Sequence, residues 1–235
     1  MLRFSQVDVF TDELTKGNAL AVVHDAEGLS TEEMAAFANW TNLAETTFLL
    51  PPRDPAADYR VRIFTTSREL AFAAPPLLRT GPVENLPALA AGLAIPPDEI
   101  VEARWADNGP GWVAVLLRSA DAVLALRPDY TRFGEFTGIG VVGPHEDGGD
   151  AAFEVRAFVD EDGRFGEDPV TGSLNASIAQ WLIPAEIARR QYVAAQGTVL
   201  GRRGRVHLSQ ADGQIWVGGD TVVGITGKVA LQPVR

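Results

Sequence analysis

The chain has 235 residues, 46% of them hydrophobic, which is enough for the core of one large or two small domains. Its net charge of −11 argues against nucleic acid, whose phosphates need clustered Lys and Arg, and the absence of cysteine excludes disulfides, thiolate metal sites and thiol catalysis. No apolar run approaches the roughly 18 residues that cross a bilayer, so we expect a cytoplasmic protein with no membrane partner.

The first 64 residues predict strands and one helix. Ser30 and Glu33 form a capping-box pattern that opens the helix. Glu45 lies where this helix has ended and a strand begins, which suits a site residue, although a lone Glu there is more often a surface charge. The expected elements are strands at 2–9 and 19–23, a helix from Ser30 through Trp40, and strands at 45–50 and 59–64.

The organisation changes after Leu70. Residues 71–78, AFAAPPLL, predict an apolar strand broken by Pro75 and Pro76, where the chain crosses between domains. The rest alternates short strands with Gly turns and contains few helices, which is typical of an α+β fold. The expected elements are helices at 86–93 and 119–126, a hairpin at 105–112, and strands at 139–142, 153–159, 192–196, 205–208, 215–217, 221–225 and 229–231.

Two of these strands resemble each other. Residues 60–65, RVRIFT, and 154–159, EVRAFV, both alternate, carry a late Phe and precede a polar turn with an acidic residue. Two copies of one unit would suit a pseudo-symmetric enzyme with its site between the halves. Chance similarity between two strands explains the echo equally well.

The segment 167–173, EDPVTGS, predicts a loop that leads onto the start of a helix. From Thr171 onward, apolar residues recur at helical spacing, with Leu174 and Ile178 on one face. A helix start carries free N–H groups and partial positive charge, so it is a natural seat for a substrate carboxylate. The alternative is that Asp168 and Thr171 are only capping residues, because such caps are common.

The three histidines, His24, His145 and His207, lie far apart and lack the spacing of metal ligands. We interpret them as structural or surface residues and expect no metal. Carboxylates such as Glu45 therefore remain the candidate acid/base groups.

With these segments placed, the chain resembles the PhzF family of phenazine-biosynthesis-type isomerases. The resemblance covers most of the chain in the family's order, and EDPVTGS and the context of Glu45 are its specific parts. The matching segments are VDVFTDELTKGNALAVV, NLAETTFLL, VRIFTTSREL, DNGPGW, VRAFVDEDGRFGEDPVTGSLNASIAQWL, AAQGTVLGRRGRVHL, IWVGG and GITGKVAL.

The resemblance implies a two-lobed, diaminopimelate-epimerase-like α+β fold, each lobe a sheet wrapped round a central helix, with the active site between the lobes. The N-terminal lobe would span 1–75, with the strand at 226–235 returning to it, and the C-terminal lobe 76–225. Cofactor-free isomerisation is implied, with Glu45 and Asp168 as catalytic carboxylates. Glu45 would be the acid/base, Asp168 and Ser173 would orient the substrate, and Gly172 would give a backbone N–H to its carboxylate.

The family pattern breaks after Leu70. Family members continue there with a Gly-His turn and the central helix of the first lobe. In this chain Leu70 runs straight into AFAAPPLL, which resembles the later strand leading into the second lobe. Ala74 and Pro75 occupy the Gly-His position only superficially, and the His is missing. We expect a truncated first lobe whose sheet lacks its helix. The exposed apolar surface would make the protein less stable or favour a homodimer that covers it.

The sequence therefore predicts an isomerase or epimerase that moves a proton within a small carboxylate-bearing metabolite by carboxylate acid/base catalysis. The missing segment favours an alternative, a catalytically impaired protein that keeps its fold for binding or dimerisation. The retained Glu45, Asp168 and Ser173 favour the enzyme.

Overall fold

The computed structural model describes residues 1–70, 77–161 and 163–231. They form two compact units, one of residues 1–70 with 220–231 and the other of residues 77–219. Each unit has its own sheet and few helices, which confirms the α+β class. Residues 71–76 of the expected crossing strand lie outside the described residues, and Leu77 and Leu78 are not in a strand.

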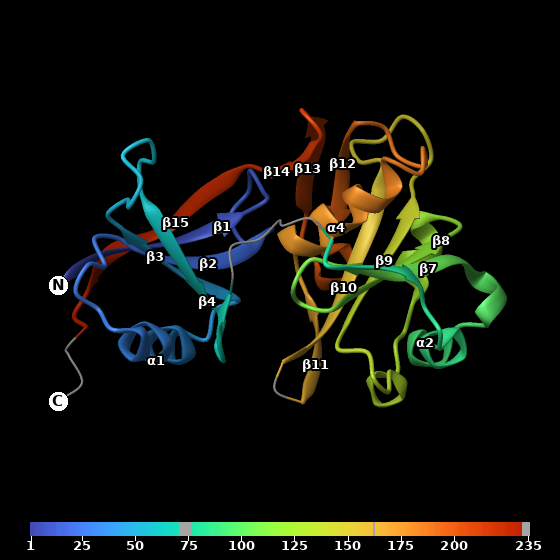
Figure 1. The fold of residues 1–235 in the computed structure, drawn as a ribbon, viewed down its shortest axis with the longest axis horizontal. Coiled ribbons are helices and arrows are strands. Elements are labelled where there is room, and N and C mark those ends of the chain that lie inside the picture. Colours follow the sequence, from blue (N-terminus) through green and yellow to red (C-terminus); the bar gives the residue numbers. More distant parts are fainter. Residues whose placement is uncertain (71–76, 162, 232–235) are drawn as a thin grey trace. The chain divides into compact units, whose positions relative to one another are not determined.

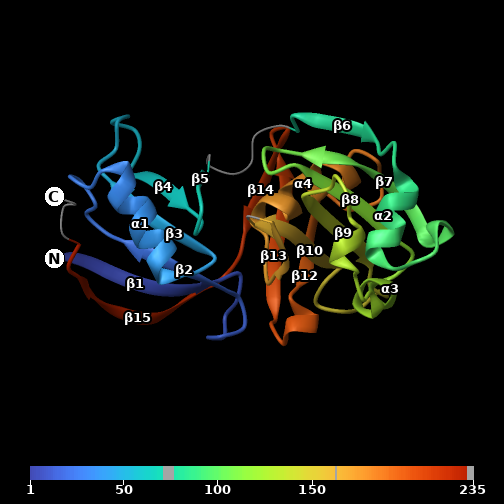
Figure 2. The same cartoon turned by 90° about the horizontal axis from the view of Figure 1, so that it is seen from below.

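The first unit is a sheet with a helix against one face (Figure 2). The helix carries the chain from the end of β2 to the start of β3, so these two strands are parallel, while the other neighbours are antiparallel. The strand order is β15-β1-β2-β3-β4-β5. The elements are β1 (Leu2–Val9), β2 (Asn18–Val23), α1 (Thr31–Thr41), β3 (Glu45–Leu50), β4 (Arg60–Phe64), β5 (Glu69–Leu70) and β15 (Thr221–Val229).

Helix α1 buries one face of this sheet. Its expected capping box is confirmed, because the Ser30 hydroxyl accepts from the Glu33 N–H and the Glu33 carboxylate accepts from the Ser30 N–H. Phe37 of the helix packs edge-on against Phe48 of β3, and Phe64 of β4 joins the same core. The face that carries Phe48 and Phe64 is therefore the covered one.

The C-terminal strand differs from its prediction. The expected strands at 221–225 and 229–231 are one continuous strand, β15, which pairs with all of β1 and has an irregularity opposite Gln6 and Val7. Gly227, expected in the turn between the two strands, lies inside β15 opposite Phe4. Gly224, which was expected in the first of the two strands, also lies in β15. A Cβ at this position would approach Leu14 Cδ1 to 2.7 Å, so the glycine permits a close contact.

The second unit has a larger sheet in the order β14-β13-β12-β10-β9-β8-β7-β6, and β11 pairs with β10. Helices α2 and α3 contribute to a core on one side of it. The strands are β6 (Arg79–Pro82), β7 (Ile100–Asp107), β8 (Trp112–Leu117), β9 (Gly138–Pro144), β10 (Phe153–Glu161), β11 (Arg164–Asp168), β12 (Gln191–Gln196), β13 (Gly204–Ala211) and β14 (Gln214–Gly218). The helices are α2 (Leu86–Leu93), α3 (Ala120–Ala125) and α4 (Gly172–Leu182), with 3₁₀ turns at Pro97–Glu99, Tyr130–Arg132 and Thr198–Leu200.

Helix α4 is the central helix of this unit (Figure 1). It contacts β13 and β14 near one end of the strand order and β7 and β8 near the other, so the sheet curves round it. The sequence predicted a helix with one apolar face. Because strands enclose it, the small residues Ala176, Ser177 and Ala179 are buried as completely as Leu174.

Candidate active site

The segment 167–173 joins strand β11 to helix α4. Glu167 and Asp168, expected in a loop, are the last two residues of β11. The prediction was wrong because Glu167 is anchored by a buried, bidentate ion pair with Arg156 of β10, at 2.7 and 2.9 Å. The turn that follows is short, since α4 begins at Gly172.

A buried hydrogen-bond network fixes this turn. Oε1 of Gln196 accepts from the Thr171 N–H at 3.1 Å and from Asn175 Nδ2 at 2.8 Å. Its Nε2 donates to the Asp168 carbonyl at 3.1 Å and to Thr171 Oγ1 at 2.9 Å. Because this hydroxyl oxygen already accepts a bond, its own proton goes to the Asp168 carboxylate. Gln196 thus holds Asp168 through Thr171.

Ser173, the second residue of α4, is held by β8 and the turn before it. The Trp112 indole N–H donates to Ser173 Oγ at 3.2 Å, and Asn108 Nδ2 donates to the Ser173 carbonyl at 3.0 Å. Since Ser173 Oγ accepts from Trp112, its own proton is directed to another acceptor. Sequence reasoning missed Asn108, Trp112 and Gln196, although it had singled out the segments that contain them, DNGPGW and AAQGTVLGRRGRVHL.

The start of α4 presents backbone N–H groups. Thr171 is the N-cap residue, but its hydroxyl bonds to Asp168 and does not cap the first turn. The N–H groups at Gly172 and Ser173 lie at the positive end of the helix. Such a helix start can bind a carboxylate.

The structure brings three of the four predicted site residues together, because Asp168, Gly172 and Ser173 lie within this one turn of the second unit. Glu45 belongs to the first unit. It is the first residue of β3, is half-buried and lies opposite Leu20 of β2. It lies on the sheet face away from α1.

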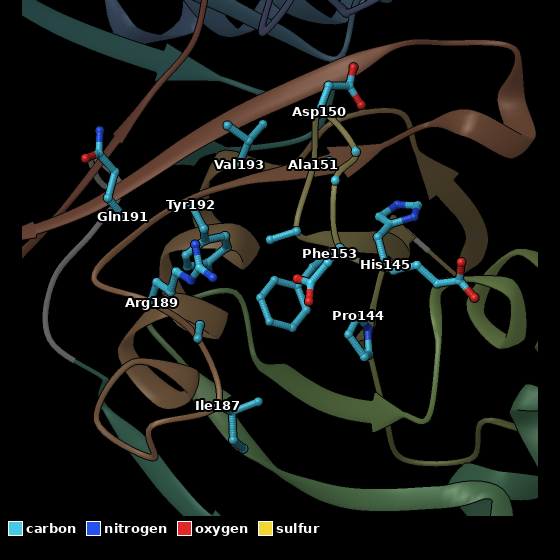
Figure 3. A pocket seen from close by; sticks show the side chains of 16 residues that line it. Pro144, His145, Asp150, Ala151, Phe153, Ile187, Arg189, Gln191, Tyr192 and Val193 are labelled. Atoms are coloured by element: carbon cyan, nitrogen blue, oxygen red, sulfur yellow. The ribbon is translucent and has the colours of Figure 1, made fainter.

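A separate cavity of about 390 Å³ opens at the ends of β9, β10 and β12 (Figure 3), and the four predicted residues do not line it. Its lining includes His145, Phe153 and Tyr192. Tyr192 packs edge-on against Phe153, and burial raises the pKa of its phenol. His145 Nε2 lies 3.1 Å from a carboxylate oxygen of Glu154, a residue whose pKa is raised by burial.

The other two histidines lie elsewhere. His24 Nε2 is 3.2 Å from Ser5 Oγ, and His207 is exposed on β13. Within residues 1–70, 77–161 and 163–231, no three His, Asp or Glu side chains gather as metal ligands do. In the same part of the chain, no helix combines the length and the apolar character needed to span a bilayer.

These features define an α+β protein of two units, in one of which a curved sheet surrounds a helix whose N-cap side chain does not cap it. The family model described as phenazine biosynthesis-like protein, PhzC-PhzF, matches residues 7–83 and 78–231. The chain therefore belongs to this family, and the resemblance found in the sequence is confirmed. The two matched segments overlap at residues 78–83 of this chain.

Two relatives and one solved structure illustrate the similarity. The trans-2,3-dihydro-3-hydroxyanthranilate isomerase of Pseudomonas aeruginosa is 45% identical over 80 residues, which are 34% of this chain and 28% of that protein. An uncharacterized isomerase of the same species is 26% identical over 277 residues, covering 98% of this chain and 99% of the relative. A PhzF-family phenazine biosynthesis protein of Enterococcus faecalis shares the fold, with a TM-score of 0.79, 21% identity, and coverage of 98% and 99% of the two chains.

The more similar relatives match this chain over only part of their length. Relatives that are 45%, 51% and 52% identical are matched over only about a quarter of their own length. The alignment over 277 residues is longer than this chain of 235 residues, so that relative carries residues that this chain lacks.

Proposed function

We propose that the chain is a cofactor-independent isomerase or epimerase that moves a proton within a small carboxylate-bearing metabolite. The observation that carries the proposal is the start of α4, because the N–H groups of Gly172 and Ser173, the hydroxyl of Ser173 and the carboxylate of Asp168 all belong to this one turn of the chain. These donors suit a substrate carboxylate. The similar isomerase of Pseudomonas aeruginosa is named for a substrate that carries one, a dihydro-hydroxyanthranilate.

Glu45 is the proton carrier in this proposal. A carboxylate can take a proton from a carbon that neighbouring unsaturation makes acidic, while the electron pair enters the unsaturated system, and then return the proton to another carbon. The helix start and the Ser173 hydroxyl stabilise the negative charge that develops on the substrate as the proton leaves. Asp168, fixed through Thr171, orients the substrate.

Hydrogen exchange into the product tests this role. The purified chain is incubated with trans-2,3-dihydro-3-hydroxyanthranilate in D₂O, and the product is followed by NMR. Glutamine cannot accept the proton, so Glu45→Gln should lower turnover by about 10²–10⁴-fold. Glu27→Gln, an exposed residue of the same unit, serves as the control. Near-normal turnover of folded Glu45→Gln would refute Glu45 as the carrier.

The second candidate is a catalytically impaired protein that keeps its fold for binding. The observation that favours it is that, among the described residues, no helix follows β5 in the first unit, whereas α4 follows β11 in the second. In this case the wild type shows no exchange, but 3-hydroxyanthranilate still binds and Ser173→Ala weakens that binding in calorimetry.

We also propose that the chain forms a homodimer. Strand β15 is an edge of the first sheet, and its Val223 and Ile225 are 58% and 54% exposed. An exposed edge strand pairs readily with a second chain. Light scattering after size exclusion should show a dimer that Val223→Lys shifts toward the monomer, and an unchanged mass for that variant would contradict pairing at this edge.

A further inference from the structure

The two units repeat one another element by element. The first contains β1-β2-α1-β3-β4-β5 and the second contains β7-β8-α3-β9-β10-β11. The pairing is of the same kind at each step. The first pair of strands is antiparallel, the strands on either side of the helix are parallel, and the last two pairs are antiparallel.

The registers of the two repeats also coincide. In the first unit Thr47 pairs with Val22 on one side and with Ile63 on the other. In the second unit Gly140 pairs with Ala114 and Ala157 in the same way. The residues can therefore be matched one to one across these three strands.

The similar segments 60–65 and 154–159 also make similar side-chain contacts. Arg62 forms a bidentate ion pair with Glu69 of the next strand, and its guanidinium lies over the ring of Phe64. Arg156 makes the same two contacts with Glu167 of the next strand and with Phe158. The structural repeat therefore runs from β1 to the end of β5.

The repeat stops where the second unit continues into α4. After β5, the next helix among the described residues is α2, which belongs to the second unit. The first unit as described therefore has no counterpart of α4. The family's two matched segments overlap close to this point, at residues 78–83, and a relative aligned over 99% of its length carries residues that this chain lacks.

The sheet face that α4 covers in the second unit is buried, whereas the matched face of the first unit is partly exposed. Ala114, Val155 and Ala157 are each 0% exposed in the second unit, and a Cβ at Gly140 would lie 2.3 Å from Leu174 of α4. The matched residues of the first unit, Val22, Thr47, Val61 and Ile63, are all partly exposed. Together with their neighbours Leu20 and Leu49, they form a surface that we call the open face.

We propose that the open face is a docking site for an α-helix that another polypeptide supplies. Helix α1 does not fill this role, because it packs on the opposite face with Phe48 and Phe64. A second copy cannot supply its own α4, because that helix is enclosed within the second unit, with Leu174 and Ile178 buried. Apolar side chains on the face mean that the occupant buries apolar residues there.

The second unit defines the chemistry of this occupant. The open face carries Val22, Thr47 and Ile63 where the α4 face carries Ala114, Gly140 and Ala157. At these three matched positions the open face has the larger side chains, which leave less room for a helix. A helix that fits it therefore has a small residue, such as Ala, Gly or Ser, at the position of Leu174. Apart from that position, the mix of apolar and small residues in α4 is the model for the partner.

Glu45 sets the direction of the docked helix. It occupies the register position of Gly138, next to that of Trp112, and the Trp112 indole contacts Ser173 at the start of α4. A helix bound in the direction of α4 therefore starts close to Glu45. The carboxylate favours the positive end of the helix dipole over the negative end, so the reverse direction is disfavoured.

A synthetic peptide tests the proposal on the full chain. The probe is the peptide of residues 168–183 with Leu174→Ala, blocked at both ends, and binding is measured by calorimetry. We expect saturable binding in a one-to-one ratio and a rise in the Tm of the first unit. The unsubstituted peptide, with the bulkier Leu174, should bind at least about tenfold more weakly.

Matched variants of the protein locate the binding. Ile63→Lys places a charge on the open face and should weaken the peptide at least about tenfold, whereas Val101→Lys, at an exposed valine of the second unit, should not. Ile63→Thr, which keeps a β-branched side chain in the strand, is a second variant that retains the fold and should weaken binding less.

Four outcomes overturn the proposal. The first is that no saturable binding of the Leu174→Ala peptide is seen. The second is that a scrambled peptide binds equally well. The third is that Ile63→Lys binds the peptide as well as the wild type does. The fourth is that the chain self-associates, Ile63→Lys abolishes that association and the peptide does not compete, since a second copy then covers the face.

Discussion

Glu154 shows what one buried carboxyl does to the stability of this molecule. Its side chain is 2% exposed on β10, and burial raises the pKa of its carboxyl, while interactions with Thr198 and then His145 lower the pKa by less. A raised pKa in the folded state means that folding disfavours the ionised form. Near neutral pH, the charge at Glu154 therefore reduces the free energy of unfolding.

Replacing this charge should stabilise the protein in one pH range only. Glu154→Gln keeps a polar side chain beside His145 and removes the buried charge, so its Tm should exceed that of the wild type at about pH 8. As the pH falls through the raised pKa, Glu154 takes up a proton in the wild type, and the difference should shrink toward about pH 4. Calorimetry across this range tests it, with the exposed Glu99→Gln as control. A constant or growing difference on acidification would contradict the argument.

At the scale of the elements, the two matched Arg–Glu pairs place one interaction in two environments. The side chains of Arg156 and Glu167 are 4% and 8% exposed, whereas those of Arg62 and Glu69 are 19% and 38% exposed. Removing one partner of a buried pair leaves an uncompensated charge, which costs about 3–5 kcal/mol, while an exposed pair contributes about 1 kcal/mol or less.

Glu167→Gln should therefore lower the free energy of unfolding of its unit by about 3–5 kcal/mol, and Glu69→Gln should lower that of the other unit by about 1 kcal/mol or less. Urea titration, followed by a spectroscopic probe in each unit, measures the two changes in the free energy of unfolding. Because β11 delivers Asp168, Glu167→Gln should also weaken the binding of a carboxylate probe, and Glu69→Gln should not. Equal costs in the two units would show that burial does not separate the pairs.

The same strands show how far the sequence predicts the fold. The capping box at Ser30 and the helix α2 were predicted correctly, because each has a local pattern. Strands β5 and β11 were not predicted, because each forms through pairing across a hairpin and an ion pair with the preceding strand. Neither has the alternating apolar pattern that marks a strand.

In the candidate site, too, the sequence identified the residues that share a local motif and missed those that act through tertiary contacts. Asp168, Gly172 and Ser173 share a short motif at a helix start, so the chemistry of helix ends was enough to single them out. Asn108, in the turn before β8, and Gln196, at the end of β12, hold that motif through hydrogen bonds that form only in the folded chain. No local periodicity marks such residues, which is why the sequence did not identify them.

At the scale of the whole molecule, the two units differ in how completely their sheets are covered. In the second unit α4 buries one sheet face while α2 and α3 contribute to the core on the other side, whereas among the described residues of the first unit only α1 is a helix. Stability rises with the apolar area that folding removes from water. The first unit should therefore be the less stable of the two.

We expect heating or urea to unfold the chain in two transitions, with residues 1–70 and 220–231 in the earlier one. Hydrogen exchange read by mass spectrometry should show β3 and β4 losing protection before β9 and β10. Val61 and Val155 hold matched places in these strands, and Val155 is 0% exposed. Val155→Ala should therefore destabilise the second transition by about 1–3 kcal/mol, and Val61→Ala should affect the first by less. If all amides exchanged together in one transition, the two sheets would have to unfold as a single cooperative unit, and the difference in their covering would have no thermodynamic consequence.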